Sequence, residues 1–160
     1  WYVTGDITEE KIDRLGHEKK PEKPEMLKNN ILLIGSGARE HAIARAIKRS
    51  KHETHLFCFG SSITPGIKVL ADEYTTGSAV DIPAILAFAK EHNITWAIIG
   101  PENPLEAGVV DALHEIGIPS VGPTKQLAKL ETSKSFTRNL LTEYAIPGCP
   151  KFRYFSAGYC

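Results

Sequence analysis

A glycine-rich turn that carries an arginine, a glutamate and a histidine is the part of this 160-residue sequence best suited to chemistry. It follows the apolar run 31–34 and precedes a segment with helical periodicity. Glycines let backbone N–H groups approach an anion closely, and a helix N-terminus adds a partial positive charge. An arginine in the first turn can bind a phosphate monoester through two parallel hydrogen bonds. We therefore expect a phosphate-binding site formed by Gly35, Ser36, Gly37, Ala38, Arg39, Glu40 and His41.

Two other interpretations of this turn start from the same residues. A dinucleotide-binding turn would need a third glycine where the chain has Glu40, and an acid about 20 residues later to hold a ribose hydroxyl. The second apolar run instead ends in Phe57, Cys58, Phe59 and Gly60, without an acid. The turn could also be a tight connection between a strand and a helix that binds no ligand. The arginine, glutamate and histidine in succession favour the phosphate site.

A second candidate loop follows a later apolar run, and its two prolines restrict the backbone on both sides of a glutamate. The carboxylate of Glu102 suits hydrogen bonding to sugar hydroxyls or to an amine. It would equally stabilise the N-terminus of the helix that follows, through the helix dipole. The sequence alone leaves both roles open. The candidate residues of this loop are Gly100, Pro101, Glu102, Asn103, Pro104 and Leu105.

Other patterns give weaker signals for chemistry. His52, His55 and Cys58 have a spacing seen in metal sites, but residues three apart on a strand point to opposite faces, so we predict no metal site there. Cys149 has no base nearby in the sequence and is expected to be inert. The chain contains neither a G-x-S-x-G nucleophile turn nor a G-x-x-x-x-G-K-[ST] phosphate loop.

The elements that must position these loops alternate between short apolar runs and helical periods. Apolar runs that end in a turn predict strands buried on both faces, and apolar stripes predict helices. The alternation predicts an α/β fold, an open parallel sheet with helices on both faces and its ligand site at the carboxyl ends of the strands. The predicted strands are 31–34, 55–59, 74–76, 95–99 and 119–121, and the predicted helices are 38–49, 65–71, 81–89, 105–116, 124–130 and 133–144. Asp81 is the expected N-cap of its helix and Gly117 the expected residue after a helix end.

The composition of the chain argues against nucleic-acid-binding, membrane-spanning and secreted disulfide-rich proteins. The chain has 19 basic and 19 acidic residues, which argues against a nucleic-acid partner because such proteins show a basic excess. No apolar run reaches the roughly 18 residues that a membrane span needs, so we expect no membrane partner. Three cysteines without a Cys-x-x-Cys pair favour a reducing, cytoplasmic location over a secreted disulfide framework.

Residues 1–29 differ in composition from the rest of the chain, because they are charged throughout and include two prolines. Such a stretch buries too little apolar surface to offset its ordering entropy. We expect an extension or linker with one short amphipathic helix that carries Ile7, Ile12 and Leu15, and a solvated arm is favoured over a binding role. The first residue is Trp1 rather than Met, which favours a fragment or a processed product.

Three ordered motifs make the chain resemble the N-terminal region of the phosphoribosylamine–glycine ligase family, also called glycinamide ribonucleotide synthetases. The motifs are 35–41, 100–105 and 122–137, and the resemblance covers about residues 30–155. The stretches 64–74 and 146–153 look most like the archaeal branch. The family's Pro-Gly-Asn-x-Gly-Thr after the second strand is replaced here by 60–66, which leaves Pro65 and Gly66 as the candidates in that loop.

The resemblance implies an ATP-grasp carbon–nitrogen ligase of purine biosynthesis, which joins 5-phosphoribosylamine to glycine with ATP and Mg²⁺ through a glycyl phosphate. After the charged extension or linker at 1–29, which lies outside the resemblance, it implies a Rossmann-like preATP-grasp domain at 30–122, and linker helices with the start of a truncated ATP-grasp domain at 123–160. The three candidate loops would hold phosphoribosylamine. Most ATP and Mg²⁺ ligands would lie in domains absent from this chain, so no catalytic or metal-binding residue is assigned. The alternatives are a stand-alone, non-catalytic phosphosugar- or nucleotide-binding domain and, third, a dinucleotide-dependent oxidoreductase.

Overall fold

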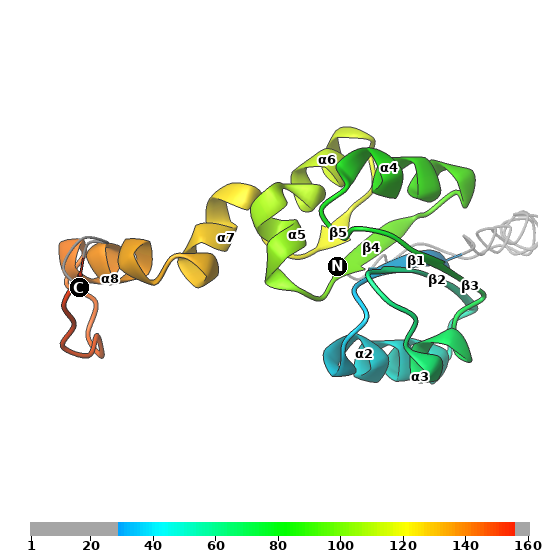
Figure 1. Ribbon diagram of the computed structural model, residues 1–160, viewed down its shortest axis with the longest axis horizontal. Helices are drawn as coiled ribbons and strands as arrows, with labels where there is room; N and C mark the ends of the chain where they lie inside the picture. The colour runs from blue at the N-terminus through cyan, green and yellow to red at the C-terminus, as the bar shows by residue number, and fades with distance from the viewer. Residues whose placement is uncertain (1–28, 156–160) are drawn as a thin grey trace, which may run out of the picture.

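The computed structural model describes residues 29–155 and contains a five-stranded sheet whose strands are all parallel (Figure 1). The strand order is β3-β2-β1-β4-β5. The first described strand, β1, therefore lies at the centre of the sheet, and the later strands lie on both sides of it. This arrangement confirms the predicted fold class. The strands are β1 (Asn29–Ile34), β2 (Thr54–Gly60), β3 (Glu73–Thr76), β4 (Trp96–Ile99) and β5 (Ser120–Val121).

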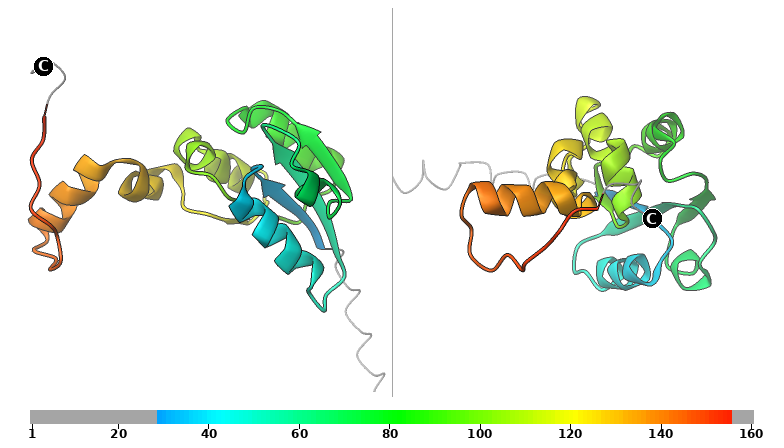
Figure 2. Two further views of the ribbon diagram at one scale, coloured as in Figure 1. Left: turned by 60° about the horizontal axis from the view of Figure 1, so that its bottom comes forward. Right: turned by 60° about the vertical axis from the view of Figure 1, so that its left-hand side comes forward.

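Helices cover both faces of the sheet, as the alternating sequence pattern predicts (Figures 1 and 2). α2 and α3 lie on one face, and α4, α5 and α6 lie on the other. Their bounds are α2 (Ala38–Lys48), α3 (Pro65–Lys68), α4 (Ile82–Glu91), α5 (Glu102–Ala107), α6 (Val109–Glu115), α7 (Lys125–Thr132) and α8 (Lys134–Glu143). None of these helices is long and apolar enough to cross a membrane.

β1 supplies side chains to both halves of the core because its residues alternate between the faces. Ile31 and Leu33 join the cluster beneath α2 and α3, whereas Leu32 and Ile34 join the cluster beneath α4, α5 and α6. All four side chains are at most 1% exposed. The continuous apolar run therefore reflects a strand covered on both sides.

Most helix ends follow the local signals in the sequence. Asp81 caps α4, where its carboxylate accepts a hydrogen bond from the N–H of Ala84 at 3.1 Å. Gly117 has φ +79° after α6. The single helix predicted over 105–116 is wrong, because Gly108 takes a left-handed conformation with φ +99° and separates α5 from α6. Glycine adopts that conformation without a Cβ penalty.

The last two helices extend away from the sheet (Figures 1 and 2). α7 packs against α5 and α6, and α8 packs against α7. α8 has no buried residue among its ten. The helix predicted around Ile7, Ile12 and Leu15 lies outside the described residues, and the predicted domain limits stay predictions.

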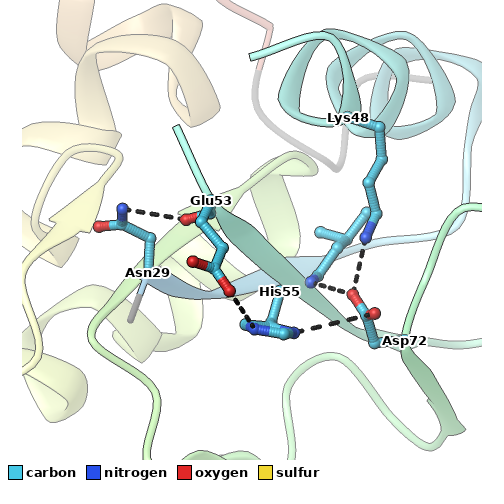
Figure 3. A network of polar contacts seen from close by, with 6 residues as sticks. Asn29, Lys48, Glu53, His55 and Asp72 are labelled. Carbon is cyan, nitrogen blue, oxygen red and sulfur yellow. Dashed lines mark hydrogen bonds and ion pairs between the residues drawn. The ribbon is translucent and has the colours of Figure 1, made fainter. Parts of the chain in front are cut away.

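A polar network joins α2, β2 and the turn before β3 at the amino-terminal edge of the sheet (Figure 3). One carboxylate oxygen of Asp72 accepts hydrogen bonds from Lys48 Nζ and from the N–H of Leu56, both at 2.7 Å. The ring of His55 lies 3.9 Å from Asp72 and 4.0 Å from Glu53. Desolvation raises the pKa of Asp72, but the hydrogen bonds from Lys48 and Leu56 and the nearby positive charges lower it more, so the pKa lies below its ordinary value.

This network predicts a pH-dependent loss of stability in Asp72→Asn. Because the folded pKa of Asp72 is depressed, its contribution is fully present above the ordinary value of 3.8 and disappears as the pH falls through the folded value. The Asp72 side chain is 41% exposed, so we expect a loss of only about 1 kcal/mol at pH 7. Chemical unfolding of the variant and the wild type across pH measures the difference, with Glu115→Gln as an exposed control. If the free energy of unfolding of the variant differed from that of the wild type by the same amount at every pH, the Asp72 charge would not be the source of the stability.

Candidate functional site

Three loops meet at the carboxyl-terminal edge of the sheet because all strands run in the same direction. They are the loops 35–37 after β1, 61–64 after β2 and 100–101 after β4. Backbone hydrogen bonds fix their starts, from the N–H of Gly35 to the carbonyl of Phe59 at 2.9 Å and from the N–H of Gly100 to the carbonyl of Ile34 at 3.0 Å. The edge expected to hold the ligand is therefore built from backbone that the sheet itself positions.

Glu40 is the one buried charged side chain among the described residues, with 4% exposure. Its Oε2 accepts a hydrogen bond from the N–H of Gly37 at 2.5 Å, which satisfies a donor at the N-terminus of α2. A Cβ atom at Gly35 would lie 2.7 Å from Glu40 Cγ, and one at Gly100 would lie 2.6 Å from Glu40 Cδ. These two glycines are needed because any side chain there would collide with the glutamate.

Arg39 connects the first and third loops. Its guanidinium donates to the carbonyl of Gly100 at 2.7 Å and lies 3.4 Å from the carboxylate of Glu102. Hydrogen bonds from its own backbone N–H and from Arg39, together with the Arg39 charge, lower the pKa of Glu102 below its ordinary value. Glu102 also stands in the first turn of α5, so the structure places it at the helix dipole and beside Arg39 at once.

Hydroxyl groups from the second loop lie around Ser36, and most of these residues were not among the candidates predicted from the sequence. Ser36 Oγ lies 3.2 Å from Ser61 Oγ and 3.4 Å from Ser62 Oγ, while Thr64 Oγ1 donates to the Ser36 carbonyl at 2.5 Å. Tyr74 holds this loop by donating to the Ser62 carbonyl at 2.6 Å. In the sequence, only the departure of residues 60–66 from the family pattern pointed to this loop.

The remaining candidates divide between the loop edge and the core. Gly66 lies against His41, because a Cβ atom at Gly66 would be 2.6 Å from the imidazole Nε2. Pro65 begins α3 in the same loop region, and Asn103 is exposed on α5. Pro104 and Leu105 are buried, the latter in the core cluster, so these two side chains support the third loop from beneath.

The assembled edge can bind an oxygen-rich anion. Gly37, Ala38 and Arg39 are exposed at the start of α2, where first-turn N–H groups have no partner inside the helix. Three of the five guanidinium N–H groups of Arg39 remain beyond the two contacts to the third loop. Serine hydroxyls and the carboxylate of Glu102 complete a set of donors and acceptors suited to a phosphate and to sugar hydroxyls.

The residues of this edge include no arrangement for nucleophilic or metal chemistry. Within 29–155 no three histidine, cysteine, aspartate or glutamate side chains come together as metal ligands. His55 and Cys58 lie on opposite faces of β2, as their spacing predicts. Burial raises the pKa of the Cys58 thiol to about 12, so the thiol is protonated at neutral pH.

Fold and site together define an α/β domain with a parallel sheet and a polar loop edge at the carboxyl ends of its strands. The family model for the phosphoribosylglycinamide synthetase N domain matches residues 29–131. The chain belongs to this family, and the resemblance found in the sequence motifs is confirmed.

Known proteins with similar sequences are longer than this chain. It is 45% identical over 126 residues to a phosphoribosylamine–glycine ligase of Methanosarcina barkeri, a match that covers 79% of this chain and 29% of that protein. The archaeal character expected from the sequence agrees with this relative. The chain thus spans less than a third of the length of the curated relatives it matches.

Solved structures support the fold. A phosphoribosylglycinamide synthetase from Anaerococcus prevotii aligns with a TM-score of 0.58 at 15% identity, over 74% of this chain and 29% of that one. An N5-carboxyaminoimidazole ribonucleotide synthetase from Thermotoga maritima aligns with a TM-score of 0.59 at 16% identity, over 74% of this chain and 32% of that one.

The burial of Glu40 predicts that it stabilises the first loop. Glu40→Ala leaves the N–H of Gly37 without its partner and opens a void between two loops, so we expect a loss of about 1–3 kcal/mol. Glu40→Gln keeps the shape and an acceptor oxygen, and should lose less. Thermal and chemical unfolding measure both variants, with exposed Glu106→Ala as the control. A Glu40→Ala protein as stable as the wild type would show that this carboxylate does not hold the loop.

Proposed function

We propose that this chain is the 5-phosphoribosylamine-binding part of a phosphoribosylamine–glycine ligase of purine biosynthesis. The observation that carries the proposal is the convergence of 35–41 and 100–102, two family motifs, at one edge of the sheet through the Arg39 bridge. The ligase joins 5-phosphoribosylamine to glycine at the expense of ATP. In this proposal the present chain binds and orients the amine substrate.

The chemistry of each loop suggests which part of the substrate it contacts. The phosphate fits the start of α2, where backbone N–H groups, Ser36 and the free side of Arg39 offer donors to a dianion. The sugar fits beside Glu102, whose carboxylate accepts hydrogen bonds from hydroxyl groups. Gly66 lies against the His41 ring, where the second loop leads into α3.

The phosphoryl-transfer chemistry would belong to other parts of the ligase. When bound there, ATP and Mg²⁺ would supply the phosphoryl group and neutralise its charge, and no described cluster in 29–155 fits as a metal site. We accordingly propose an extension at 1–29, the substrate-binding domain at 30–122, and linker helices leading toward an ATP-grasp domain at 123–160. A cytoplasmic location belongs to the same proposal.

The proposed phosphate contact predicts weaker binding of ribose 5-phosphate to Arg39→Ala. Loss of a charge-assisted hydrogen bond should cost about 1.5–3 kcal/mol of binding free energy. Titration calorimetry measures the affinity, and Arg45→Ala, exposed on the same helix, is the matched control.

A titration with unphosphorylated ribose separates two roles of Arg39. A direct phosphate contact predicts that Arg39→Ala weakens ribose 5-phosphate binding and leaves ribose binding unchanged. Equal loss for both ligands would mean that Arg39 acts only by holding Gly100 and Glu102 in place. Unchanged affinity for both would remove this loop from the site.

The proposal also predicts that the 160-residue chain is inactive alone. Transfer of a phosphoryl group to glycine requires cations around the triphosphate, and the site offers only a cradle for one phosphate. Purified chain supplied with phosphoribosylamine, glycine, ATP and Mg²⁺ should show a cooperative thermal transition and no glycinamide ribonucleotide above background. Turnover by protein free of host enzyme would contradict the proposal that phosphoryl transfer belongs to other parts of the ligase.

A further inference from the structure

An apolar groove of about 550 Å³ lies beside α2, on the side of the sheet away from α4. Its floor is formed by Ile31 on β1 and by Trp96 and Ile98 on β4, and its wall by Ile43 and Ile47 on α2. The groove runs along the amino-terminal half of the sheet face and is distinct from the loops that form the candidate substrate site.

The groove exists because the helices on this face cover only the half of the sheet that contains β1, β2 and β3. α2 and α3 lie over β1, β2 and β3, and no helix of the described residues covers β4 and β5 on the same face (Figure 1). Trp96 and Ile98 are only partly buried there. Val121 pairs in register with Ile98 and is 58% exposed. An apolar sheet face of this kind requires a partner.

The first segment of the chain is tethered at this groove. Asn29, the first residue of β1, lines the groove itself, so the peptide bond that joins residues 1–28 to the described chain lies at the groove. The linker 16–28 can span at most about 45 Å, which is enough to reach any part of the groove. A tethered segment also has a high effective concentration at a nearby surface.

The segment 6–15 matches the groove in both apolarity and charge. Its apolar residues are Ile7, Ile12 and Leu15, and its acids are Asp6, Glu9, Glu10 and Asp13. Two exposed bases, Arg49 and Lys51, flank the groove residue Ser50 at the end of α2. An acidic segment with apolar side chains therefore finds an apolar floor and a basic helix end beside it.

We propose that residues 6–15 bind in this groove as an intramolecular cover of the uncovered sheet face. Ile7, Ile12 and Leu15 pack toward Trp96 and Ile98, and the acids face the bases at the end of α2. This assignment replaces the solvated arm expected from composition alone. It is independent of the proposed ligase function, because the groove shares no residue with the substrate loops.

Trp96 provides a direct probe, because the chain has two tryptophans and Trp1→Phe leaves Trp96 as the only one. In this parent, acrylamide quenching and the emission maximum report how well the groove is covered. We expect Ile7→Ser/Ile12→Ser/Leu15→Ser to shift the emission to the red and to raise the quenching constant. Tyr2→Ser/Val3→Ser, which removes two apolar residues outside the segment, should leave both values at those of the parent.

Cysteine pairing gives a second measurement that does not use fluorescence. In a Cys149→Ser/Cys160→Ser background, Ile12→Cys with Ile43→Cys should oxidise to an intramolecular disulfide faster than Val3→Cys with Ile43→Cys. Circular dichroism checks that each protein keeps its fold.

Each remaining outcome overturns the proposal. Equal quenching in the parent and the triple serine variant, or equal disulfide rates, would show that the segment does not occupy the groove. Protection of Trp96 that disappears on dilution of the parent would assign the groove to a second copy of the chain.

Discussion

Burial of β1 on both faces is the constraint on which the rest of this structure depends. A strand without contact to water needs hydrogen-bonded strands on both sides and a layer of helices above and below. The order β3-β2-β1-β4-β5 satisfies the first need, and the helices that connect the parallel strands satisfy the second. Since every crossover returns the chain to a parallel strand, the loops after β1, β2 and β4 all reach the same edge. The candidate site is a consequence of that geometry.

Glu40 shows how this edge differs from a dinucleotide site. In a dinucleotide-binding turn a third glycine lets the helix approach the strand closely. Here a glutamate occupies that position, and the close approach is provided instead by Gly35 and Gly100, the residues directly after β1 and β4. The carboxylate then binds the N–H of Gly37 from within the protein. The first loop is thereby held from below, and its exposed upper side stays available for a small phosphorylated ligand.

Arg39 belongs both to the contacts that hold the loops and to the proposed phosphate site. The same guanidinium that holds the Gly100 carbonyl also carries the positive charge nearest the start of α2. The pKa of Glu102 is lowered first by the hydrogen bond from its own backbone N–H and then by the hydrogen bond and charge of Arg39. The hydroxyl groups of Ser61 and Ser62 contact Ser36 and add polar groups to the edge without adding charge.

The sequence by itself determined the elements and their order, because apolar runs and helical stripes are local patterns that burial imposes directly. It also predicted Gly35–His41 and Glu102 as candidate site residues, since glycines, prolines and an arginine at the end of a strand have few structural uses. The break at Gly108 was not predicted, because the apolar stripe continues across it and only packing decides the left-handed conformation. The burial of Glu40, the Arg39 bridge over 61 residues and the contact of Ser36 with Ser61 were decided by the tertiary structure alone. These contacts join residues that no local pattern relates, and they form only when the parallel strands bring their ends to one edge.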